Sequence, residues 1–243
     1  MVLACSLVAC PPGPAPAAGA EPPLSAHPFP IHLVTGPDAS RVREILRDHF
    51  ISRKHRSRFE TTPKVYRYLL ERIPLAATLI RVLRFGKYKI TERPGGVLTV
   101  DSGGGLVLTV RVHHKSESRL VAFIEGVYRS WWTTGIHGRA AVRIRFRPAD
   151  AEGWPAMEND FLGFIKFRSP VVEFFARVVN FFLRRMTDRE IMAGRNAGRS
   201  LTEILAKNPA RVYRAMRKSP EVSRKALEEF RRIFLPPETS AAR

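Results

Sequence analysis

The chain has 243 residues, of which 44% are hydrophobic, enough for one medium-sized domain with a buried core. Its two cysteines, Cys5 and Cys10, lie in the first ten residues, which excludes disulfides and cysteine-bearing metal sites from the rest of the chain. No apolar run reaches the roughly 20 residues of a transmembrane helix. The net charge of +19 favours a polyanionic partner, either an anionic membrane surface or nucleic acid.

The N-terminal segment 1–28 resembles the leader of a bacterial lipoprotein. The run Leu7-Val8-Ala9-Cys10 is similar to a lipobox, and a proline-rich tether follows it at 11–16. The apolar stretch before Cys10 is short and lacks the basic residues of a complete signal peptide. The resemblance implies lipidation of Cys10 and a place in the bacterial cell envelope, on the periplasmic side. The alternative is an unstructured leader on a cytoplasmic protein.

Two helical regions are expected before the sheet. A short strand is predicted at 31–35, and apolar residues spaced three and four apart predict a helix over 38–50. The basic run 53–58 follows and is interpreted as one of several charge clusters. Thr62 and Pro63 form the N-cap and first-turn proline of a second helix, which Pro74 interrupts before it resumes to about residue 83.

From residue 87 to 168 the hydrophobic period changes to two, which predicts six strands of an antiparallel meander. The expected strands span 87–92, 97–102, 105–113, 118–128, 138–147 and 160–168. The fifth strand alternates most clearly, with Val142, Ile144 and Phe146 on one face. Its other face carries Arg143, Arg145 and Arg147. The sheet is therefore expected to have one apolar face and one solvated, basic face.

A long apolar helix is predicted after the last strand. It begins at Ser169-Pro170 and continues to Met186, with phenylalanines over most of its circumference, which is typical of a buried helix. The remaining residues are expected to form short basic amphipathic helices. We therefore divide the chain into a leader and tether (1–28), an α+β domain (29–190) and a basic helical tail (191–243).

The order of these elements resembles the START-like, or helix-grip, superfamily. The resemblance covers about residues 29–190 and depends on the order of elements, because no sequence motif carries it. It implies an α+β fold in which a curved antiparallel sheet of six to seven strands packs on a long C-terminal helix, here with an additional helical tail. Members of that superfamily mostly bind lipids, sterols or other apolar ligands, although the fold alone decides no function.

A ligand cavity between the sheet and the long helix is one interpretation, and a filled core is the other. Ligand sites are usually apolar and contain a few polar groups. The two adjacent tryptophans are placed at the mouth of the cavity or at a membrane interface. The residues assigned to the cavity are Leu108, Val142, Ile144, Phe146, Phe164, Phe174, Trp131 and Trp132.

No residue pattern in the chain indicates catalysis, a cofactor or a metal site. His113 and His114 are neighbours on a strand and point to opposite faces, and no Gly-x-Ser-x-Gly elbow is present. We expect a non-enzymatic, lipid-anchored envelope protein that binds an apolar, lipid-like ligand and docks on an anionic membrane. The residues expected at the membrane surface are Arg143, Arg145, Arg147, Arg211 and Arg214. The alternative is a cytoplasmic nucleic-acid-binding protein that uses the C-terminal helices.

Overall fold

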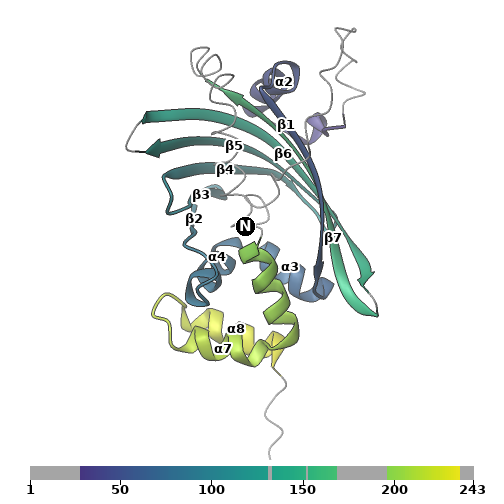
Figure 1. Cartoon of the computed structure of the whole chain (residues 1–243), viewed down its shortest axis with the longest axis vertical. Coiled ribbons are helices and arrows are strands. Elements are labelled where there is room, and N and C mark those ends of the chain that lie inside the picture. Colours follow the sequence, from purple (N-terminus) through teal and green to yellow (C-terminus); the bar gives the residue numbers. More distant parts are fainter. Residues whose placement is uncertain (1–27, 131–132, 152, 169–195, 236–243) are drawn as a thin grey trace, which may run out of the picture.

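A curved sheet of seven antiparallel strands forms the centre of the molecule (Figure 1). The computed structural model describes residues 28–130, 133–151, 153–168 and 196–235. The strand order is β1-β7-β6-β5-β4-β3-β2, so β1 is one edge and β2 the other. The strands are β1 (Ile51–Glu60), β2 (Lys89–Arg93), β3 (Val97–Asp101), β4 (Leu106–Lys115), β5 (Arg119–Ser130), β6 (Thr133–Ala151) and β7 (Trp154–Phe167).

The prediction of an α+β fold with a curved antiparallel sheet of six to seven strands is confirmed. The six strands expected between 87 and 168 are β2 to β7, although β6 and β7 are longer than predicted. The order of strand, two helices and six strands is the one that the helix-grip resemblance implies. The predicted long helix from Ser169-Pro170 to Met186 lies outside the described residues.

The first strand lies in a different place from the one predicted. Residues 31–35 do not form a strand, because Ile31–Leu33 is the short 3-10 helix η2. The strand is β1, which contains the basic run 53–58. β1 pairs with β7 alone and forms an edge of the sheet, where charged side chains are common because they discourage pairing with another chain.

Two helices cover the concave face of the sheet. They are α3 (Pro63–Glu71), which the Thr62 side chain caps as predicted, and α4 (Ile73–Val82), which has Pro74 in its first turn. Their inner residues pack on alternate residues of the strands, and the sheet curves around them (Figure 1). This concave core contains Tyr66, Leu70, Ile73, Ala77, Ile90, Leu98, Val100, Val110, Leu120, Ala122, Ile124, Val142, Ile144, Phe146, Met157 and Phe161.

The C-terminal helices pack on the other side of α3 and α4. Residues 196–207 are helical, and α7 (Pro209–Arg217) and α8 (Arg224–Phe234) follow. Leu201, Met216 and Phe230 are completely buried in a cluster with residues of α3 and α4. Arg72 of α3's C-terminal end also forms an ion pair with Glu229 of α8. The two central helices therefore contribute to two cores at once.

The convex face of the sheet is half covered, which differs from the fully solvated face that the sequence predicts. Helix α2 (Asp38–Arg47) lies on it, together with Phe29, and buries Phe123, Ala141 and Phe164 (Figure 1). The N-terminal end of α2 is held by buried Asp38, which contacts His113 at 3.2 Å and Arg111 at 3.7 Å. Beyond α2, this face carries charged side chains such as Arg145 together with polar and apolar ones such as Thr109 and Val127.

Truncation of Phe230 tests whether the C-terminal helices are an integral part of the fold. Because this ring is fully buried among α3, α7 and α8, Phe230→Ala is expected to lower the free energy of unfolding by about 3–5 kcal/mol. Phe234→Ala removes a partly buried ring one turn later and is expected to lower it less. Urea unfolding followed by circular dichroism measures both. A separate early transition of the helices alone would contradict this packing.

Candidate functional site

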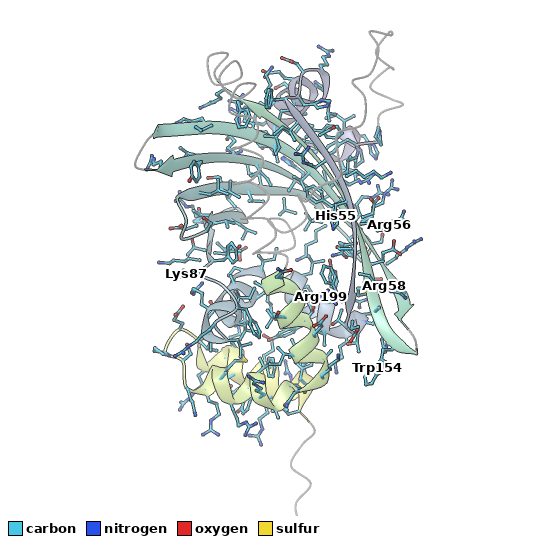
Figure 2. All side chains as sticks on the ribbon, in the orientation of Figure 1. His55, Arg56, Arg58, Lys87, Trp154 and Arg199 are labelled. Atoms are coloured by element: carbon cyan, nitrogen blue, oxygen red, sulfur yellow. The ribbon has the colours of Figure 1, made fainter. Side chains whose placement is uncertain are left out.

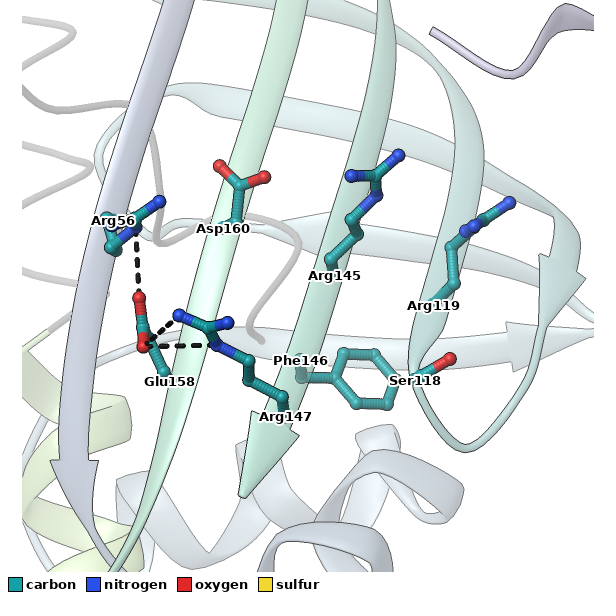
Figure 3. A pocket seen from close by; sticks show the side chains of 8 residues that line it. All are labelled: Arg56, Ser118, Arg119, Arg145, Phe146, Arg147, Glu158 and Asp160. Carbon is teal, nitrogen blue, oxygen red and sulfur yellow. Dashed lines mark hydrogen bonds and ion pairs between the residues drawn. The ribbon is translucent and has the colours of Figure 1, made fainter. Parts of the chain in front are cut away.

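A basic pocket lies on the uncovered part of the convex face, where four strands run side by side (Figure 3). One row of directly paired residues crosses it: Arg119 of β5 faces Arg145 of β6, which faces Asp160 of β7, which faces Arg56 of β1. Paired residues of neighbouring strands point to the same face. The pocket has a volume of about 310 Å³, and its lining residues are Arg56, Ser118, Arg119, Arg145, Phe146, Arg147, Glu158 and Asp160.

The carboxylates of the pocket do not neutralise its arginines. Glu158 is shared, because it pairs with Arg56 and with Arg147, each at 2.9 Å. Arg119 and Arg145 have no ion-pair partner among the residues that the structure describes. They are nevertheless direct cross-strand partners, and like charges in such positions repel each other.

A fifth arginine, Arg143, lies beside this row, two residues from Arg145 on β6 and on the same face. Arg143 is only 3% exposed and donates to Asp160 at 2.8 Å and to the Pro28 carbonyl at 2.9 Å. Its Nε and the Oδ1 of Asp160 are buried and have no hydrogen-bond partner among the described residues. Burial, followed by the charge of Arg145, lowers the pKa of Arg143; Asp160 opposes this, and Arg119 adds to it. The positive charges of Arg145 and Arg119 therefore act on the pKa of Arg143, a side chain that is buried in the protein.

The arrangement of these groups suits the binding of an anion. Arginine presents several donors in a planar fork that matches phosphate and carboxylate oxygens, and the two unpaired guanidinium groups have donors to offer. The pocket and the adjacent Arg143 together contain five arginines and two carboxylates, so they have an excess of positive charge. Within the described ranges, no group of three or more histidine, cysteine, aspartate or glutamate residues is placed to hold a metal ion.

Four of the predicted cavity residues lie together on the concave side. Leu108, Val142, Ile144 and Phe146 belong to the concave core or pack against it. The prediction for Phe164 is wrong, because its ring lies on the convex face against Phe29. The alternation of β7 explains the difference, since even-numbered residues of this strand pair with convex residues of β6. Phe174, Trp131 and Trp132 lie outside the described residues, as does Cys10.

The predicted surface arginines are divided between three environments. Arg145 and Arg147 line the pocket, whereas Arg143 is not at the surface, because the segment around Pro28 covers it. Arg211 and Arg214 are exposed on α7, beyond the two central helices. The expected surface contacts therefore do not form one site.

Sequence reasoning missed five residues of the pocket. Arg56 is part of a predicted charge cluster, and Ser118, Arg119, Glu158 and Asp160 belong to no predicted site. The alternation of β1 was the available signal, because Lys54, Arg56 and Arg58 are two residues apart.

Replacement of one unpaired arginine is expected to stabilise the protein. Arg145→Gln relieves the repulsion with Arg119 and is expected to raise the free energy of unfolding by about 0.2–1 kcal/mol. The matched control Arg147→Gln breaks a pair with Glu158 and is expected to lower it slightly. Both are measured by urea unfolding at low salt. A loss of stability in the Arg145 variant would show that this guanidinium group is compensated.

Comparison with known proteins gives structural similarities alone: no family model and no curated protein matches the chain. A conserved protein from Geobacillus kaustophilus is 9% identical, with a TM-score of 0.44 over 63% of this chain and 97% of that one. The Mll3558 protein from Rhizobium loti is 12% identical, with a TM-score of 0.36 over 60% and 96% of the two chains. Ara h 8.0201 is also 12% identical, with a TM-score of 0.32 over 60% and 97%. These similarities identify no ligand or activity.

Proposed function

We propose that this protein is a non-enzymatic binding protein that docks on anionic, phosphate-bearing membrane surfaces through the convex pocket. The observation that carries the proposal is the direct pairing of Arg119 with Arg145, neither of which forms an ion pair among the described residues. Such a pair costs stability unless an anion compensates it. A headgroup phosphate has the charge and the oxygen geometry to bridge two guanidinium groups.

A lipid anchor at Cys10 would provide a second attachment to the same membrane, in the bacterial cell envelope. The acyl chains of a lipidated Cys10 would hold the protein at the membrane, and the basic face would add an electrostatic contact with the same surface. Each lysine or arginine close to an anionic surface contributes about 1 kcal/mol to binding. Among the described helices, none combines the length and apolarity that crossing a bilayer requires.

Paired charge-removal variants test the docking site. Arg119→Gln with Arg145→Gln removes two charges and is expected to weaken binding to phosphatidylglycerol vesicles about thirtyfold, measured by sedimentation. The control, Arg211→Gln with Arg214→Gln, removes the same charge from α7 and is expected to change binding by less than about threefold.

The two variants also separate the competing explanations. An equal loss in both would mean that net charge alone drives binding, and a larger loss in the α7 variant would place the contact on the C-terminal helices. Absence of binding by the wild-type protein would overturn the proposal. Nucleic acid as the anionic partner, through those helices, would then become the leading explanation.

Binding of an apolar, lipid-like ligand beneath the concave face is a second candidate, which Asn159 favours. This side chain is completely buried beside the concave core, and neither of its amide atoms has a hydrogen-bond partner among the described residues. A buried amide without a partner is costly, and the polar group of a bound ligand would satisfy it. Leu108 argues for a filled core instead, since its Cδ2 occupies the space that a Cβ on Gly126 would need.

Extraction of lipid from the purified protein distinguishes a ligand-binding cavity from a filled core. We expect chloroform–methanol extracts of natively purified protein to contain a lipid in near-equimolar amount, identified by mass spectrometry. Asn159→Leu is expected to reduce the bound amount, because the ligand loses its polar contact, while the protein stays folded. If the wild-type protein contains no lipid and takes up none from vesicles, the concave face is a packed core.

A further inference from the structure

The tip of the β6–β7 hairpin presents an exposed tryptophan. Trp154 is 63% exposed and is the one large hydrophobic side chain classed as exposed among the described residues. β5 pairs with β6 only as far as Arg145, whereas β7 continues to pair with β6 up to Ala151 and Trp154. The hairpin therefore extends beyond β5, and Trp154 lies at its end (Figure 2).

Trp154 and the arginine pocket lie on the same face of the sheet. Side chains two residues apart on a strand point the same way, so Trp154 of β7 shares the face of Glu158 and Asp160. At about 3.3 Å per residue, Trp154 is about 13 Å from Glu158 along the strand. Arg147 and Arg58, the cross-strand neighbours of Glu158, point to this face too. The aromatic ring and the basic groups can therefore contact one flat surface together.

This combination fits a lipid bilayer better than a nucleic acid. Tryptophan prefers the headgroup level of a bilayer, where its ring is buried and its indole N–H stays hydrated, and arginine binds the phosphates at the same depth. Proteins that bind single-stranded nucleic acid stack successive bases on several aromatic rings. In the part of the chain that the structure describes, the convex face offers only Trp154 as an exposed ring of this size.

We infer that Trp154 inserts into the interfacial region of an anionic bilayer while Arg56, Arg58 and Arg147 contact lipid phosphates beside it. The inference rests on the proposed function, because it names the bilayer as the partner of the same face and adds the hairpin tip as a point of insertion. The geometry gives the docked protein one orientation, in which the convex face meets the membrane and α7 and α8 point away from it (Figure 1).

Tryptophan fluorescence of the full chain tests the insertion. The chain has three tryptophans, so Trp131→Phe with Trp132→Phe leaves Trp154 as the single reporter. With phosphatidylglycerol vesicles we expect its emission to shift to shorter wavelength and to be quenched by lipids brominated near the headgroup. With phosphatidylcholine vesicles we expect neither change. Sedimentation of the same samples measures docking independently.

The outcomes separate insertion from docking. Protein that sediments with the vesicles while its Trp154 emission stays unchanged overturns the insertion and leaves the docking proposal standing. Protein that does not sediment overturns both. A shift with single-stranded DNA and none with vesicles would assign the ring to base stacking, and would also overturn the insertion.

A second variant keeps the test valid if the double phenylalanine variant does not fold. Trp154→Ala in the otherwise unchanged chain removes an exposed side chain and should leave the fold intact. Loss of the buried ring area is expected to weaken vesicle binding about ten- to a hundredfold. Trp154→Phe keeps a ring and is expected to lose less. Unchanged affinity in the alanine variant would overturn the insertion.

Discussion

The two-residue period of the seven strands determines on which face of the sheet each strand side chain lies. Each strand divides its side chains between a concave and a convex face, and α3 and α4 pack on the concave face. Among the described residues, those that cover the convex face are in α2 and in the segment 29–34. Arginines at alternate positions of β1 and β6 are therefore placed on the remaining open surface, beside carboxylates of β7 that are too few to neutralise them.

The helices α3 and α4 are the other constraint, because they are shared by two cores. One side of the pair packs on the sheet, and the other packs on residues of α7, α8 and the helix before them. Tyr66 and Tyr68, two positions apart on α3, lie in different cores, so this helix connects the concave core with the C-terminal helices. The C-terminal helices are thus packed on the same two helices that support the sheet.

The sequence patterns predicted most of the sheet and failed at its edge and at the pocket. Alternation over residues 87–168 revealed β2 to β7, because those strands bury one face or both. β1 has apolar residues mainly at its two ends, Ile51 and Phe59. The residues between them are mostly charged or polar, so no alternation of apolar residues reveals the strand. The pairing of Arg119 with Arg145 depends on strand register, which a single sequence does not give. Burial of Arg143 depends on a contact with Pro28, 115 positions away along the chain.

That contact with Pro28 also ties the beginning of the described chain to the convex face. The Pro28 carbonyl accepts a hydrogen bond from Arg143, which lies two residues from Arg145 on β6 and on the same face of the sheet. Seventeen residues separate Cys10 from Pro28 and span at most about 60 Å when fully extended. If Cys10 carries the anchor proposed above, this short tether keeps the basic face at a high effective concentration near the membrane. The lipid anchor and the basic face then bind one bilayer together, and each contact can re-form while the other still holds.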